Sequence, residues 1–232
     1  MADTQKFLSG LKQIGIPDEN IPSLFEKLDK YINEIILFNS AYNLTNTSDY
    51  DEIVVNHILD SLASYKTILE LAKNFCNIEN ESENNIKIAD IGSGGGLPGI
   101  PLAAAFPQFN FTLVERMDKR CAFLENCAAI CGLKNVTILK KEAEKVPPES
   151  FDIATFRAFR PLDKKMAKTL LSLTKKSGFL VAYKAKLKNI QEEMNGIKEL
   201  NLNYFIKNIC VPFLTDSENS ENRERNLVII NK

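Results

Sequence analysis

Cysteine and histidine, the side chains that most often form disulfides or bind zinc, are scarce in this chain. It has five cysteines and one histidine in 232 residues. The cysteines are an odd set without a C-x-x-C pair, so the sequence indicates neither a disulfide framework nor a metal site. Cys127 and Cys131 would share one helix face, where we expect small core residues rather than ligands. The full set is Cys76, Cys121, Cys127, Cys131 and Cys210.

Long apolar runs are also missing. No apolar stretch approaches the roughly 20 residues that span a membrane. The first residues, MADTQKFLSG, have neither the basic nor the apolar block of a signal peptide. We therefore expect a cytoplasmic protein without a membrane partner. The chain has 232 residues, of which 44% are hydrophobic, so it is long enough and apolar enough for one large core and an appended element.

The formal net charge of −1 is small, but the charges are unevenly distributed. Residues 1–85 contain 6 Lys and Arg against 14 Asp and Glu, whereas residues 86–232 contain 23 against 16. A basic C-terminal part indicates either a surface that faces a polyanion or lysines that are merely solvated on helices. Charge alone leaves both interpretations open.

Glycine is concentrated between Ile88 and Pro101, in the segment IADIGSGGGLPGIP. This segment is a short apolar strand that ends in an acid and runs into a glycine loop. Glycine allows the backbone to turn at positive φ and lets a ligand approach the main chain closely. Pro98 and Pro101 fit the first turn of a following helix. This order of strand, glycine loop and helix predicts a site for a nucleoside cofactor. The alternative is a tight turn without a ligand, but such a turn needs only one or two glycines.

The surroundings of the loop distinguish two cofactors. From Gly94 to Gly99 the loop matches the dinucleotide pattern G-x-G-x-x-G. However, Asp90 stands two residues before Gly92, where its carboxylate would repel a diphosphate. The same acid favours S-adenosylmethionine, which carries a sulfonium and an amino group. Glu115, about 20 residues further on, could accept ribose hydroxyls of either cofactor, so NAD stays the alternative.

The pattern along the chain predicts two parts. Apolar residues recur at helical spacing from Phe7 to about Ala72. The polar stretch NFCNIENESENN is predicted to be a surface loop. After it, apolar strands alternate with helices, which predicts a doubly wound parallel sheet with helices on both faces. The predicted parts are a helical element at residues 1–73, a loop at 74–85 and a Rossmann-like domain at 86–232.

The last two predicted strands refine the fold class. They are YFIKNICVPF and NLVIINK, joined by a short polar segment. Such a connection predicts an antiparallel hairpin at the edge of the sheet. This arrangement is typical of class I S-adenosylmethionine-dependent methyltransferases rather than of dehydrogenases. We therefore predict an α/β protein of class I with an N-terminal helical element.

Further motifs accompany the glycine loop. YNLT and NHILDSL precede it, and LVE, KRCAFLE, EAE, FRAF, VAYK and RNLVII follow it. Together they resemble the bacterial 16S rRNA guanine-N7 methyltransferases of the RsmG, or GidB, family, over nearly the whole chain from about Phe38 onward. The resemblance implies S-adenosylmethionine as cofactor and 16S rRNA or the small ribosomal subunit as partner. It also implies methylation of N7 of a guanine in the decoding-region loop.

The resemblance places the methyl-donor site on Gly92, Leu97, Ala143, Glu144 and Arg157. Gly92 would let the backbone meet the methionine part of the donor, and Leu97 would pack on it. Ala143 and Glu144 would lie near the adenine edge. Arg157 is expected to bind either the donor carboxylate or an RNA phosphate.

Glu115 ends the second predicted strand, and we expect both of its carboxylate oxygens to hold the ribose hydroxyls.

Three further residues are candidates for RNA contact. His57 lies in the amphipathic segment VVNHILDSLAS, where it is either a packed structural residue or one that positions RNA or closes the donor pocket with Asp60. Lys184 and Arg225 lie at the end of one predicted strand and the start of another, where their charges suit phosphate.

The implied reaction needs no general base, because N7 of neutral guanine has a free lone pair. The segment TFRAF stands where enzymes that methylate exocyclic amines commonly have an Asn-Pro-Pro-aromatic run. Catalysis would then come mainly from proximity and alignment, and we expect no catalytic side chain. Two alternatives stay open on the residues alone: an NAD-dependent oxidoreductase and a noncatalytic RNA-binding protein.

Overall fold

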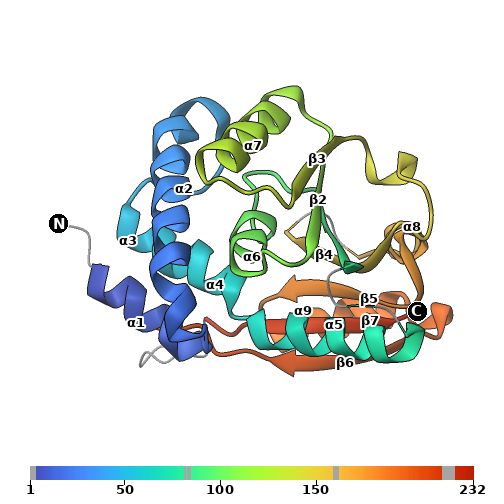
Figure 1. Cartoon of the computed structure of the whole chain (residues 1–232). Coiled ribbons are helices and arrows are strands. Elements are labelled where there is room, and N and C mark those ends of the chain that lie inside the picture. The colour runs from blue at the N-terminus through green and yellow to red at the C-terminus, as the bar shows by residue number, and fades with distance from the viewer. Residues whose placement is uncertain (1–3, 81, 83–84, 159–161, 216–222) are drawn as a thin grey trace.

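The strands among the residues that the structure describes form one seven-stranded sheet, with helices on both of its faces (Figure 1). The computed structural model describes residues 4–80, 82, 85–158, 162–215 and 223–232. The longer helices are α1 (Thr4–Ile14), α2 (Ile21–Tyr42), α5 (Tyr65–Glu79), α6 (Gly99–Ala105), α7 (Asp118–Ile130), α8 (Lys164–Leu173) and α9 (Leu187–Gly196). Between α2 and α5 lie α3 (Tyr50–Ile53), the π-helical turn η2 (Val54–Leu59) and α4 (Asp60–Leu62). The strands are β1 (Lys87–Ile91), β2 (Asn110–Glu115), β3 (Val136–Lys140), β4 (Phe151–Arg157), β5 (Thr174–Lys184), β6 (Asn203–Asn208) and β7 (Asn226–Asn231).

The strands lie in the order β3-β2-β1-β4-β5-β7-β6. The first five are parallel, and β7 is antiparallel to both β5 and β6. The doubly wound parallel sheet and the antiparallel hairpin at its edge are therefore confirmed. The strand order reverses between β1 and β4, and ligands of such sheets bind beyond the carboxyl ends of the strands at this point.

Helices α1, α2, α5, α6 and α7 cover one face of the sheet. Their buried side chains form one continuous core with it, which includes Tyr31 of α2, Phe75 of α5 and Phe111 of β2. Figure 1 shows α1 and α2 at one end of the molecule, whereas α5 lies along β5. The predicted helical element is thus packed directly on the sheet, while the domain boundaries themselves stay a prediction.

Helices α8 and α9 cover the opposite face. Met166 of α8 and Ile190 of α9 are buried there against strand residues such as Leu180 and Val228. Helix α8 begins at a polar cap, because the side chain of Asp163 accepts a hydrogen bond from the amide of Met166. Helix α8 follows the carboxyl end of β4 in the chain, and α9 follows the carboxyl end of β5.

Two predicted element boundaries were wrong. Helix α5 continues to Glu79, because Phe75 and Cys76 extend its buried face and Asn80 then ends it at a φ of 55°. The loop predicted over residues 74–85 therefore begins at residue 80, and its residues 81, 83 and 84 lie outside the described part. Strand β6 ends at Asn208, after which the chain turns.

Two general features concern the described residues as a set. None of the helices in them is both long and apolar enough to cross a lipid bilayer. Within the same residues, no three His, Cys, Asp or Glu side chains gather as a metal site would require.

Candidate functional site

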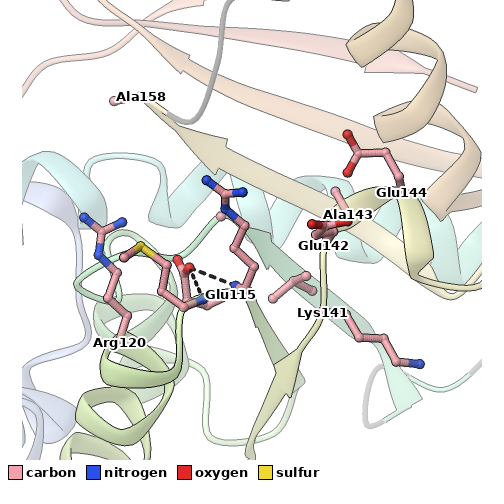
Figure 2. Close-up of a pocket in the computed structure, with 11 residues that line it drawn as sticks. Glu115, Arg120, Lys141, Glu142, Ala143, Glu144 and Ala158 are labelled. Atoms are coloured by element: carbon pink, nitrogen blue, oxygen red, sulfur yellow. Dashed lines mark hydrogen bonds between the residues drawn. The ribbon is translucent and has the colours of Figure 1, made fainter.

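A cavity of about 180 Å³ opens at the carboxyl ends of β1, β2 and β3 (Figure 2). Its wall combines Gly92 after β1, Glu115 at the end of β2, and Ala143 and Glu144 after β3. Figure 2 shows Arg120 of α7 at one side of this cavity and Glu144 at the other. Four residues predicted for the methyl-donor site therefore line one cavity, which we call the donor pocket.

Glu115 is buried and both of its carboxylate oxygens already accept backbone hydrogen bonds. Oε2 accepts from the amide of Gly94 at 2.9 Å. Oε1 accepts from the amides of Arg116 and Met117 at 2.8 and 2.9 Å (Figure 2). A carboxylate oxygen has two acceptor positions, so Oε2 keeps one for a ligand hydroxyl while Oε1 keeps none. The geometry therefore favours a single ribose contact, whereas the sequence predicted two.

Asp90 lies behind the glycine loop and does not line the donor pocket. Its Oδ2 accepts from the amide of Gly99 at 3.0 Å, and Ser93 donates to its backbone carbonyl. Burial raises the pKa of Asp90 to about 7, an effect opposed by the Gly99 hydrogen bond and by the positive charge of Arg157. Asp90 thus holds the loop against the start of α6, and its contact with the donor stays a prediction.

The glycine loop is braced by the N-terminal helices. The hydroxyl of Tyr31 in α2 donates to the carbonyl of Gly95 at 2.5 Å. Leu44, in the loop after α2, lies 3.4 Å from the position that a Cβ on Gly95 would take. Gly94 has a φ of 56°, in the left-handed region that favours glycine. Leu97 is buried in the core and, like Gly94, does not line the donor pocket.

A second cavity of about 400 Å³ adjoins the donor pocket, and Ala158 lines both. Ala158 has a φ of 48°, a conformation that non-glycine residues rarely adopt and that is often found at functional sites. The second cavity, which we call the cationic pocket, is lined by Asn56, His57, Asp60, Arg157, Ala158, Tyr183, Lys184, Ala185, Ile209, Arg225 and Asn226. All three predicted RNA contacts, His57, Lys184 and Arg225, therefore face one cavity.

Arg157 also lines the cationic pocket rather than the donor pocket. Its Nη1 lies 2.9 Å from Oδ2 of Asp60, while Nε of Arg225 lies 3.0 Å from Oδ1 of the same carboxylate. The sequence did not predict this shared ion pair. The spacing of His57 and Asp60 in NHILDSL puts them on one helix face, but nothing local indicates which arginines they meet.

His57 lies in the π-helical turn η2, and such turns are often found at functional sites. Its Nε2 lies 3.3 Å from Oδ1 of Asn46, and its Nδ1 lies 3.5 Å from Nη2 of Arg157. Burial, followed by the charges of Arg157 and Arg225, lowers the pKa of His57 to about 4. The imidazole is therefore uncharged at neutral pH, with Nε2–H donating to Asn46 and Nδ1 facing the guanidinium.

Lys184, at the end of β5, is paired with an acid of α9. Its Nζ lies 2.7 Å from Oε2 of Glu193 and 5.5 Å from the ring centre of Phe156. The neighbouring Tyr183 hydroxyl lies 2.5 Å from Oγ of Ser64. The sequence predicted neither partner: Glu193 is only nine residues from Lys184, but the Ser64 that contacts Tyr183 is 119 residues away in the chain.

Comparison with known proteins identifies the family. Residues 24–222 match the family model GidB, described as rRNA small subunit methyltransferase G. The chain belongs to this family. A Treponema denticola protein named ribosomal RNA small subunit methyltransferase G is 41% identical, over 97% of this chain and 93% of its own length. A Ureaplasma parvum protein with the same name is 38% identical, over 77% of this chain and 73% of its own length.

A solved structure confirms the fold of this GidB-family protein. The tRNA (m1A58) methyltransferase TrmI of Aquifex aeolicus superimposes with a TM-score of 0.55 at 15% identity, covering 87% of this chain and 75% of that chain. This likeness concerns the class I methyltransferase fold alone. S-adenosylmethionine is the cofactor of the family, and the donor pocket fits it, since Gly92 leaves the backbone accessible and Glu115 keeps a free acceptor position. Neither the NAD-dependent nor the noncatalytic alternative finds support.

Proposed function

We propose that this GidB-family protein transfers the methyl group of S-adenosylmethionine to N7 of a guanine in the decoding-region loop of 16S rRNA. The observation that carries the proposal is the meeting of two cavities at Ala158. One cavity has the features of a methyl-donor site, and the other is lined by cationic side chains that suit an RNA nucleotide. Donor and acceptor could therefore meet where the cavities join.

The donor pocket supplies backbone and carboxylate contacts. Gly92 would face the methionine part of the donor, and Oε2 of Glu115 would accept one ribose hydroxyl. Ala143 and Glu144, after β3, would lie at the adenine end of the cavity. When bound, S-adenosylmethionine supplies a methyl carbon made electrophilic by its positively charged sulfur.

The cationic pocket would receive the target nucleotide. Arg157 and Arg225 keep guanidinium donors beyond those used for Asp60, and such donors match phosphate oxygens or the O6 atom of guanine. Lys184 adds a third cation at the same cavity. Phosphate contacts of this kind would position the RNA, while the walls next to Ala158 would orient the base.

No side chain of the cationic pocket has to remove a proton in this reaction. N7 of guanine already has its lone pair, and the uncharged His57 is occupied by Asn46 and Arg157. The rate enhancement then comes mainly from holding N7 in line with the methyl carbon, which can supply about 7–11 kcal/mol.

The proposal is tested by methylating small ribosomal subunits that lack this modification. The purified protein is incubated with the subunits and S-adenosylmethionine. One portion of the RNA is digested to nucleosides, and mass analysis identifies the methylated base; a second portion is cut to oligonucleotides, and mass analysis of these locates it. We expect 7-methylguanosine at one position in the decoding-region loop. A methylated adenine, a methyl group on another guanine atom, or no methylation of subunits or naked 16S rRNA would contradict the proposal.

A binding experiment distinguishes S-adenosylmethionine from NAD as the cofactor. Calorimetry with S-adenosylmethionine and with NAD should show saturable binding of the first only. Gly94→Val tests the glycine loop in the same assay. Its control is Gly196→Val, which places the same substitution at a glycine near the end of α9, where a Cβ would have open space. Gly196→Val should bind S-adenosylmethionine like the parent, and Gly94→Val should not.

A further inference from the structure

Asp60 holds together two arginines from distant parts of the chain. Its carboxylate contacts Arg157, at the end of β4, through Oδ2 and Arg225, just before β7, through Oδ1. The side chain of Asp60 is 8% exposed, and those of the two arginines are 16% and 26% exposed. We call these three residues the Asp60 cluster.

The Asp60 cluster has an excess of one positive charge. Two guanidiniums face one carboxylate, and the adjacent His57 is uncharged. Lys184 does not change the balance, because Glu193 contacts it at 2.7 Å. Without the carboxylate, two cations with limited access to water would remain in one cavity, where their charges are screened less than on the surface.

The proposed reaction creates a positive charge beside this cluster. The N7 lone pair of guanine forms the new bond to the methyl carbon, and the electron pair of the carbon–sulfur bond stays with sulfur. The positive charge therefore moves from sulfur to the guanine ring, and no proton is transferred. Two unopposed guanidiniums next to the ring would raise the free energy of the methylated base and of the transition state that leads to it.

We propose that Asp60 is a positioning residue that orients Arg157 and Arg225 and offsets one of their charges where the target base becomes cationic. This inference rests on the proposed guanine-N7 methylation. It assigns two effects to one carboxylate: fixing the guanidiniums and making the pocket tolerant of a methylated guanine. The second effect distinguishes Asp60 from a residue that only maintains the fold.

The test compares the affinity of the full chain for two RNA fragments of the decoding-region loop, one with guanine and one with 7-methylguanine at the target position. The measured quantity is the ratio of the two dissociation constants. In Asp60→Asn the ratio should shift by about tenfold or more against the methylated RNA, as expected for removing one opposing charge within roughly 12 Å of the ring at an effective dielectric constant of about 20. Arg225→Gln should shift the ratio in the opposite direction. The double variant keeps the parental charge and should restore the parental ratio.

The matched control is Asp18→Asn, which removes the same charge from a carboxylate that is 77% exposed and paired with Lys12 at 3.4 Å. This variant should keep the parental ratio. Calorimetry with S-adenosylmethionine verifies that Asp60→Asn is folded; if it is not, the opposite shift in Arg225→Gln decides. Equal losses for both RNAs in Asp60→Asn, or an unchanged ratio in Arg225→Gln, would overturn the inference. Failure of the parent to produce 7-methylguanosine would instead refute the proposed function.

Discussion

Tyr31→Phe removes a single hydroxyl from the contact between α2 and the glycine loop. That hydroxyl donates to the carbonyl of Gly95, and the side chain is completely buried. Because Phe keeps the ring and its packing, the loss is confined to the hydrogen bond. A buried carbonyl left without its donor costs about 1–3 kcal/mol, so we expect the free energy of unfolding to fall by about 2 kcal/mol.

The same substitution should weaken the binding of S-adenosylmethionine. Gly95 follows Gly94, whose amide donates to Glu115 in the donor pocket. A loop released from Tyr31 has to be ordered when the donor binds, and we expect its affinity to fall about fivefold, which corresponds to about 1 kcal/mol. A change that destabilised the core elsewhere would not produce this second effect in protein that is still folded.

Urea denaturation with linear extrapolation measures the first effect, and calorimetry with S-adenosylmethionine measures the second. Tyr204→Phe is the matched control, because it removes the same hydroxyl from a tyrosine that is 42% exposed on β6. The control should change the free energy of unfolding by less than about 0.5 kcal/mol. If Tyr31→Phe behaves like Tyr204→Phe in both measurements, α2 does not brace the loop.

Three further predictions concern the two pockets. Gly94→Val should abolish donor binding while far-UV circular dichroism keeps the parental helix content, because valine is strained at positive φ; affinity within twofold of the parent would reject the donor-pocket assignment. With donor and RNA saturating, His57→Gln should keep the single-turnover rate within about tenfold, and the parental rate should be flat from about pH 6 to 8. The imidazole with its pKa of about 4 stays uncharged there, and Asp90, whose pKa is about 7, lines neither pocket. The pKa of His57 lies below the value of about 6.5 in the unfolded chain, so His57 lowers stability as pH falls from 6.5 to 4, and denaturation of His57→Gln should show a smaller loss over that window. Replacing Lys184 and Arg225 by Gln should reduce the slope of log affinity for RNA against log salt by about two, and an unchanged slope would place the RNA surface elsewhere.

Local patterns in the sequence were sufficient to predict the sheet and to bring Gly92 and Glu115 to one edge of it. The alternation of strands and helices is a periodic signal, and Gly92 and Glu115 follow their strands directly, so their meeting at one edge follows from the parallel arrangement. Helix α5 was cut short in the prediction, because the polar Asn74 and Asn77 masked the buried Phe75 and Cys76 between them. Element boundaries depend on such burial, which a polar composition hides.

Contacts between distant residues were not predictable in the same way. Tyr31 and Gly95 are 64 residues apart, and Asp60 is 97 and 165 residues from its two arginines. These contacts depend on how α2, α4 and the residue before β7 are placed against the sheet, and a single sequence carries no local signal for that placement. The orientation of the Glu115 carboxylate toward three backbone amides was missed for a related reason, since residue type does not determine which donors a side chain reaches.

The position of β7 in the sheet has a consequence for biosynthesis. Strand β7 follows β6 in the chain but lies between β5 and β6. Until β7 has been synthesised, β6 therefore has no partner in the sheet and β5 is paired with β4 alone. A ribosome that stops within the segment between residues 209 and 225 would release a chain in which the backbone of β5, along Leu180 and Val181, forms an open strand edge to which other chains could pair. Such edges promote aggregation, and the same product would lack Arg225. Premature termination would therefore yield insoluble, inactive chains rather than a partly active enzyme.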